Sequence, residues 1–135
     1  MIQIYTTPSC ASCRKAKKWF DQYKIPYSEK NIFSIKLSKE DIFRMLANSE
    51  NGFDDIISTR SKVFKEKKLD PDNMSVQELI EFIIDYPSVL KRPIIINENE
   101  LQVGYNNEDI TIFLPKELRN LDSFSDFDAE PINVK

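Results

Sequence analysis

The fold is decided by the opening stretch Ile2-Gln3-Ile4-Tyr5-Thr6-Thr7-Pro8-Ser9-Cys10-Ala11-Ser12-Cys13. Alternating apolar and polar residues from Ile2 to Thr6 predict a strand, and the next three residues predict a turn. A helix follows, because apolar residues recur at helical spacing at Cys13, Ala16, Phe20 and Tyr23. Residues 27–33 predict a second strand. The chain therefore begins with a β-α-β unit that carries two cysteines where its first strand gives way to its helix.

Two helices in the middle of the chain are marked by capping boxes. Each begins with a serine followed three residues later by an acidic residue, namely Ser38 with Asp41 and Ser75 with Glu78. We expect the first helix to end near Gly52, where glycine can adopt the left-handed conformation of a helix terminus. The second should end before Pro87, since the residue preceding a proline is disfavoured in a helix. Short helices are expected between them, over residues 54–69.

The last third of the chain predicts a β-hairpin, with strands at residues 93–96 and 101–103 and a polar turn between them. A closing helix should begin near Asn107 and another after Pro115. This order of elements is that of an α/β, thioredoxin-like domain with a helical insertion between the β-α-β unit and the hairpin. We assign residues 1–120 to this single domain and residues 121–135 to an acidic C-terminal tail.

Composition excludes several common classes of enzyme. The chain has no histidine, so it holds no Ser-His-Asp triad and no imidazole base. Its two glycines are too few for a phosphate-binding loop, and its two cysteines cannot close a zinc site alone. We therefore expect no cofactor and no metal. The N-terminus does not resemble a signal peptide and no apolar run is long enough to span a membrane, so we expect a cytoplasmic protein.

Charge is distributed unevenly along the chain. Residues 1–120 carry 18 basic and 18 acidic side chains, so the net charge of −3 comes from residues 121–135. A neutral body argues against a protein that holds DNA unaided. Two basic clusters are present nonetheless, at residues 14–18 and 60–68. The simplest interpretation of each cluster is a solvated helix face.

Cys10 and Cys13 form the first candidate site. The free amides and the dipole at a helix N-terminus favour ionisation of a thiol there, and Arg14 and Lys15 add positive charge. We expect Cys10 to be the attacking thiol and Cys13 the resolving thiol that closes a disulfide. Two alternatives remain open, namely half of a shared zinc site and two inert buried thiols.

Arg92 and Pro93 form the second candidate site. Thioredoxin-like domains usually carry a cis proline at the start of the strand that faces the cysteine loop. Arg92 would then direct its guanidinium toward the thiolate, and Arg60, from the helical insertion, would supply another. The alternative is a surface arginine beside a proline that begins a strand.

Several motifs at fixed separation resemble the Spx/MgsR regulators of the arsenate reductase-like (ArsC/Spx) family. They are residues 7–16 (TPSCASCRKA), residues 55–62 (DIISTRSK), residues 91–96 (KRPIII), residues 101–106 (LQVGYN) and residues 113–115 (FLP). The match stays in register over about residues 1 to 120. This resemblance is far more specific than a single C-x-x-C motif.

The resemblance implies a regulator of transcription rather than an enzyme. Spx-like proteins bind the C-terminal domain of the RNA polymerase α subunit, reach promoter DNA only through the polymerase complex, and redirect transcription under thiol and other stress. Cys10 and Cys13 match the disulfide that switches these proteins. Gly52 matches the glycine placed against the α subunit, Arg92 the arginine kept near the disulfide, and Arg60 lies in the matching Ser-Thr-Arg-Ser stretch.

The tail after residue 120 departs from the usual Spx tail, which directs degradation by the ClpXP protease. ClpXP therefore stays only a candidate partner of this chain. The principal rival function is an arsenate reductase, in which one cysteine and three arginines hold the oxyanion. This sequence offers Cys10, Arg60 and Arg92, but the hairpin at residues 101–105 lacks the third arginine. A glutaredoxin-like disulfide reductase is a further alternative, although no glutathione site is recognisable.

Overall fold

The computed structural model describes residues 1–58, 60–68 and 70–115. Within these residues, a mixed sheet has the strand order β2-β1-β3-β4. Its strands are β1 (Ile2–Thr6), β2 (Tyr27–Asn31), β3 (Ile94–Ile96) and β4 (Leu101–Val103). Strand β1 runs parallel to β2 and antiparallel to β3, and β3 pairs with β4 as an antiparallel hairpin. The predicted β-α-β unit and the predicted hairpin are both confirmed.

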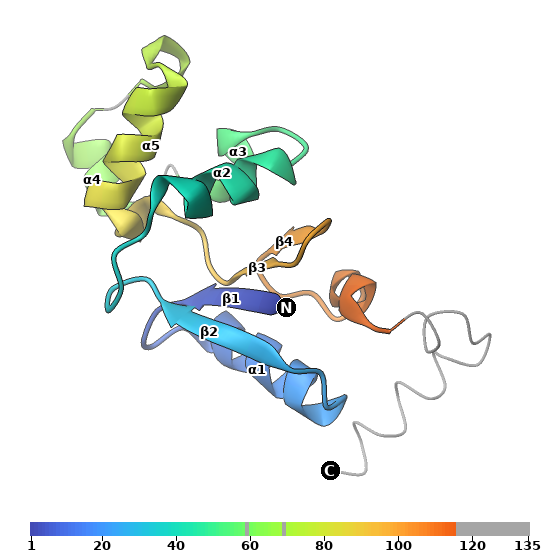
Figure 1. Ribbon diagram of the computed structural model, residues 1–135. Coiled ribbons are helices and arrows are strands. Elements are labelled where there is room, and N and C mark those ends of the chain that lie inside the picture. The colour runs from blue at the N-terminus through green and yellow to red at the C-terminus, as the bar shows by residue number, and fades with distance from the viewer. Residues whose placement is uncertain (59, 69, 116–135) are drawn as a thin grey trace.

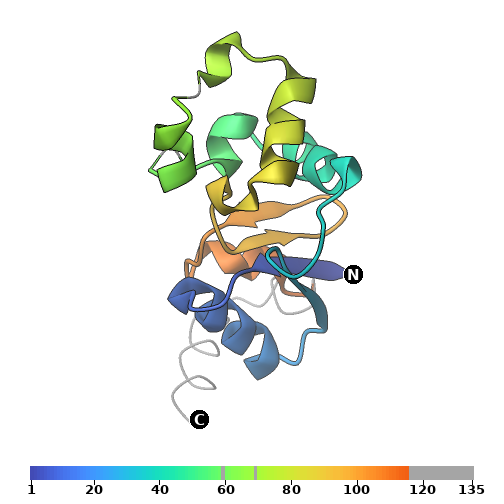
Figure 2. The same ribbon diagram turned by 90° about the vertical axis from the view of Figure 1, so that its left-hand side faces the viewer.

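Helices cover both faces of this sheet (Figures 1 and 2). One face carries α1 (Ala11–Gln22), and the 3₁₀ turn Asp109–Phe113 packs beside it. The other face carries the helical insertion. Its helices are α2 (Lys39–Ala47), α3 (Phe53–Ile56), α4 (Lys62–Glu66) and α5 (Val76–Asp85). The expected short helices between α2 and α5 are confirmed, and the α/β class with its helical insertion is the one predicted.

The sheet separates two hydrophobic clusters. In β3, Ile95 packs with Trp19 and Phe20 of α1, whereas Ile94 and Ile96 pack with the helical insertion. This division follows from the alternation of side chains along a strand. Burying one isoleucine contributes about 1.5–3 kcal/mol, so a three-residue strand that is buried on both faces anchors both halves of the domain.

Both predicted capping boxes are present. Ser38 accepts a hydrogen bond from the backbone N–H of Asp41 at 3.1 Å, and its own N–H donates to the Asp41 carboxylate at 2.9 Å. The Ser75 and Glu78 pair repeats the arrangement at the start of α5. Each box satisfies two backbone donors that a helix start leaves free.

One predicted helix boundary and one predicted helix type are wrong. Helix α2 ends at Ala47, well before Gly52, because Asn48 and Ser49 bond the last carbonyls. Gly52 does adopt a positive φ, at 66°, but it is the residue that precedes α3. The closing helix near Asn107 is a 3₁₀ turn. The predicted helix after Pro115 and the predicted tail at residues 121–135 lie outside the described residues.

Candidate redox site

The two cysteines lie at the N-terminus of α1, as predicted, and form a disulfide. Cys10 is the N-cap residue, and its Sγ accepts a hydrogen bond from the backbone N–H of Cys13 at 3.1 Å. The two Cα atoms are 5.2 Å apart, inside the usual range for a bonded pair. Cys13 is 1% exposed, whereas Cys10 is partly exposed. A reagent from solvent therefore reaches Cys10 first.

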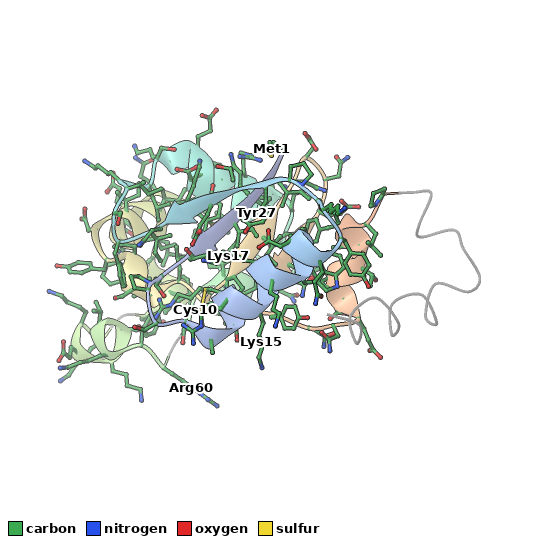
Figure 3. The ribbon with its side chains drawn as sticks, turned by 90° about the horizontal axis from the view of Figure 1, so that it is seen from below. Met1, Cys10, Lys15, Lys17, Tyr27 and Arg60 are labelled. Atoms are coloured by element: carbon green, nitrogen blue, oxygen red, sulfur yellow. A yellow bond between two sulfur atoms is a disulfide. The ribbon has the colours of Figure 1, made fainter. Side chains whose placement is uncertain are left out.

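Positive charge surrounds this end of α1. The first turn of the helix has no acidic residue, and Arg14 and Lys15 are exposed. Figure 3 shows Cys10 at the start of the helix, with Lys15 and Lys17 farther along it. Lys17 is held by Glu29 of β2 at 3.0 Å, so its charge is partly neutralised. With the disulfide reduced, the helix dipole and the free cations favour a thiolate at Cys10.

A groove of about 570 Å³ opens beside Cys10 and brings the predicted site residues together. Cys10, Arg60 and Arg92 all line it, although they come from three distant parts of the chain. Figure 3 shows Arg60 on the segment beside the start of α1. The structure thus brings these three residues to one groove, and the expectation that both arginines serve the cysteine site stays a prediction.

Arg92 has a structural partner that the sequence did not indicate. Its Nη1 donates hydrogen bonds to the carbonyl oxygens of Ser88 at 3.2 Å and Leu90 at 3.0 Å. The peptide bond between Arg92 and Pro93 is cis, as predicted, and Pro93 lies directly before β3, the neighbour of β1. Arg92 therefore fixes the segment before β3, and its support of a thiolate stays a prediction.

Backbone hydrogen bonds hold the two arginine-bearing segments together. The N–H of Ser58 donates to the carbonyl of Val89 at 2.7 Å, and the N–H of Lys91 donates to the carbonyl of Ile56 at 2.8 Å. These bonds flank an antiparallel bridge between Ile57 and Leu90. The segment that leads to Arg60 and the segment that carries Arg92 therefore keep a fixed separation across the groove.

Two further groove residues were not among the predicted site residues. Lys91 lines the groove, and its Nζ donates to the carbonyl of Asp54 at 3.3 Å. Phe33 also lines it and is 56% exposed. Lys91 adjoins Arg92 in the sequence, which is the only signal that indicated it. Phe33 was predicted to end a strand, and no sequence signal showed that its ring faces solvent.

Gly52 does not line this groove. It lies in the connection between α2 and α3, and a Cβ added to it would meet nothing within 4 Å. The residues before it are fixed by Asp55, whose carboxylate accepts backbone hydrogen bonds from Glu50 at 2.9 Å and Asn51 at 2.8 Å. The bond from Asn51 is the main reason why the pKa of Asp55 is lowered. Gly52 is thus presented on an ordered, open surface.

The described part of the chain has no cluster of three or more Cys, Asp or Glu side chains that could hold a metal ion. Within the same residues, no helix has both the length and the apolar character needed to cross a membrane. The paired sulfur atoms of Cys10 and Cys13, with cationic side chains lining the groove beside Cys10, support thiol chemistry at this site.

A mixed sheet, a C-x-x-C at the start of the first helix and a cis proline before the neighbouring strand define a thioredoxin-like domain. The family model described as ArsC family matches residues 5–113. The chain belongs to the ArsC family and, within it, to the Spx group. This confirms the resemblance found in the sequence motifs.

The relatives that place it in the Spx group are similar over most of their length. Global transcriptional regulator Spx 1 of Bacillus cereus is 50% identical over 119 residues, covering 88% of this chain and 91% of that protein. Global transcriptional regulator Spx of Bacillus subtilis is 48% identical over 120 residues, covering 89% and 92%. These similarities support a global transcriptional regulator, the function predicted from the sequence.

Solved structures agree on the fold. An arsenate reductase from Vibrio cholerae superposes with a TM-score of 0.76 at 19% identity, covering 84% of this chain and 97% of that one. A putative ArsC family related protein from Bacteroides fragilis gives 0.70 at 26% identity, covering 80% and 92%. At 19% identity the reductase shows a shared fold and carries no argument about activity.

Proposed function

We propose that this chain is a redox-responsive global regulator that binds the C-terminal domain of the RNA polymerase α subunit and redirects transcription under thiol or oxidative stress. The observation that carries the proposal is the identity of 43–50% to Spx regulators over most of the chain. The disulfide between Cys10 and Cys13 supports its redox part. The regulator works in the cytoplasm, without a cofactor, and contacts promoter DNA only within the polymerase complex.

The surface around Gly52 is the contact that we assign to the α subunit. Three features support this assignment: a Cβ added to the glycine would meet nothing within 4 Å, the preceding loop is ordered by Asp55, and the surface lies outside the groove that holds Cys10. The switch and the polymerase contact then occupy different places. The redox state of the cysteines therefore acts on how the bound regulator engages a promoter.

A second candidate function is arsenate reduction, because Cys10, Arg60 and Arg92 share one groove. The third arginine is missing from the hairpin region where it is expected, since β4 (Leu101–Val103) and the next two residues, Gly104 and Tyr105, offer none. Losing one charge-assisted oxyanion contact costs on the order of 1.5–3 kcal/mol, about 10- to 100-fold in binding. Arg92 is also engaged by two carbonyl oxygens. We therefore propose that the chain is not an enzyme.

The test is a titration of the full chain, reduced and oxidised, against the purified C-terminal domain of the α subunit. We expect saturable one-to-one binding in both states. Gly52→Arg should abolish binding, because its side chain occupies the contact surface. Gly52→Ala is the matched control, since it carries the same backbone strain of about 1–3 kcal/mol at φ 66° without the bulk.

If the folded chain binds the α-subunit domain in neither redox state, the proposal is overturned and the thiol enzyme is favoured. Equal binding by the parent and a folded Gly52→Arg variant would place the contact elsewhere. ClpXP stays a candidate partner, to be tested by the lifetime of the full chain in the presence of that protease.

A further inference from the structure

The loop between α2 and α3 holds Asn51, the only asparagine of the chain that is followed by a glycine. Asn51 is exposed to solvent. In an exposed asparagine, the side-chain Cγ can be attacked by the backbone nitrogen of the next residue, which closes a cyclic succinimide. A side chain on that next residue hinders the approach, and glycine has no side chain. The pair Asn51 and Gly52 therefore combines the residue types that favour this reaction most.

The structure leaves the attacking nitrogen available. Within the described residues, the backbone N–H of Gly52 donates no hydrogen bond, whereas the N–H groups of Glu50 and Asn51 both donate to Asp55. A Cβ placed on Gly52 would meet nothing within 4 Å, so the space beside its backbone is open. The succinimide can therefore form without displacing a packed side chain.

Asp55 holds the side chain that the reaction would change. Its Oδ1 accepts a hydrogen bond from Nδ2 of Asn51 at 3.3 Å, and its Oδ2 accepts the backbone N–H of the same residue at 2.8 Å. These donors are part of the reason why the pKa of Asp55 lies below its ordinary value. The side-chain bond is the longer of the two, so it restrains the amide of Asn51 only weakly.

Loss of the amide reverses the sign of this contact. The product carries a carboxylate oxygen where Nδ2 now donates to Asp55, so two negative charges face each other in place of a hydrogen bond. Like charges at such a separation repel. Glu50 and Asp54 add two further carboxylates to the same short segment. An isoaspartate product also inserts a methylene group into the backbone directly before Gly52. Both products therefore weaken the contacts that order the loop.

We propose that Asn51 is a site of spontaneous deamidation and that its product releases the loop before α3 from Asp55. The backbone nitrogen of Gly52 gives up its proton to a base in solution and bonds to Cγ of Asn51. The side-chain nitrogen takes up a proton and leaves as ammonia. Water then adds to either carbonyl carbon of the succinimide, which opens to aspartate or isoaspartate.

The overall change is the hydrolysis of one amide to a carboxylate and ammonia, with no oxidation or reduction. Because the ammonia is lost to solvent, the change runs in one direction and accumulates with the age of the chain. The proposal does not rest on the proposed function, although the loop carries the surface around Gly52 that we assign to the α subunit.

Peptide mapping by mass spectrometry tests the reaction in the intact, oxidised chain. The chain is incubated at neutral pH and physiological temperature for several days and then digested, and a sample digested at time zero corrects for reaction during digestion. We expect the peptide with Asn51 to gain one mass unit and to separate into aspartate and isoaspartate forms. Asn99 is the internal control, because it is exposed in the hairpin turn but is followed by Glu100. It should react many times more slowly.

Two variants separate the chemistry of Asn51 from general ageing of the chain. Asn51→Gln keeps the amide but places it one methylene farther from the attacking nitrogen, and Gly52→Ala puts a methyl group beside that nitrogen. Both should suppress the mass gain. If Asn51 of the folded parent reacts no faster than Asn99, the proposal is overturned. Aspartate that forms without any isoaspartate would overturn it as well, because a succinimide opens at both carbonyls.

Asn51→Asp reproduces the charge of the product and tests its effect on the loop. By NMR titration, the pKa of the Asp55 carboxyl should be higher in this variant than in the parent, because a like charge replaces a donor. The backbone amides of residues 50 and 51 should exchange with solvent several-fold faster. Asn99→Asp, the same charge change in the hairpin turn, should alter neither readout. An Asn51→Asp variant that keeps both parent values would show that deamidation does not release the loop from Asp55.

Discussion

Cys10 performs two tasks with one sulfur atom. Its Sγ is bonded to Cys13 and also accepts the backbone hydrogen bond that caps α1. Cys10→Ser keeps a cap acceptor, whereas Cys10→Ala removes it and should cost a further ~0.5–2 kcal/mol of stability. Both variants should bind the α subunit and lose the response of promoter transcription to diamide. Thermal unfolding and in vitro transcription measure the two effects, and a full diamide response in either variant would place the switch elsewhere.

Arg60 and Arg92 line one groove but differ in what holds them. Arg92 donates to the carbonyls of Ser88 and Leu90, whereas Arg60 is exposed. Arg92→Ala should therefore lower the free energy of unfolding by about 1–2 kcal/mol, because both carbonyls lose a charged donor. Arg60→Ala should change it by less than about 0.5 kcal/mol. Urea unfolding of the two variants checks this difference, and equal midpoints would contradict it.

At the scale of elements, α2 depends on the carboxylate of Asp41. Burial alone would raise the pKa of Asp41, but hydrogen bonds from the Ser38 backbone and the Tyr5 hydroxyl, with the charge of Lys30, hold it below its ordinary value of 3.8. A pKa that is lower in the folded state means that the ionised group stabilises the fold above pH 3.8. This stabilisation disappears as the pH falls through the lowered pKa.

Asp41→Asn should accordingly destabilise the domain by about 1 kcal/mol at pH 7. The difference between parent and variant should narrow as the pH falls below 3.8, because the parent then loses its carboxylate as well. Urea midpoints at several pH values from 7 to 3 test this expectation. Asp72→Asn, an exposed carboxylate outside the helices α1–α5, is the control. A gap between parent and Asp41→Asn that stays constant with pH would contradict the role given to ionised Asp41.

Local signals predicted the elements well, and tertiary contacts explain what they missed. Capping boxes act within four residues, so the starts of α2 and α5 could be predicted from Ser38 and Ser75. Gly52 was predicted to end α2, but it directly precedes α3. Glycine adopts a positive φ both at the end of a helix and in the turn before one, so the residue type alone does not distinguish the two positions. The groove as a whole was not predicted, because Phe33 and Lys91 are far apart in the sequence and come to line it only in the folded domain.

At the scale of the whole molecule, the three isoleucines of β3 join two cores. Ile96 is 0% exposed and packs with the helical insertion, while Ile95 packs with α1 on the opposite face. The described body is therefore expected to unfold as one cooperative unit, although its two clusters lie on different sides of the sheet. The only tryptophan of the chain, Trp19, lies in the α1 cluster at 2% exposure and reports on that side alone.

Ile96→Ala tests this cooperativity, because it removes side-chain volume from the cluster that Trp19 does not touch. The loss should be about 2–5 kcal/mol, a large share of the 5–15 kcal/mol typical of a domain. In the oxidised chain, the fluorescence midpoint of Trp19 should fall together with the circular dichroism midpoint, as it should for the matched variant Ile95→Ala. If Ile96→Ala lowers only the circular dichroism midpoint, the insertion unfolds separately. A change in the redox state of Cys10, at the start of α1, would then not be coupled through one cooperative fold to the surface around Gly52, which the helical insertion carries.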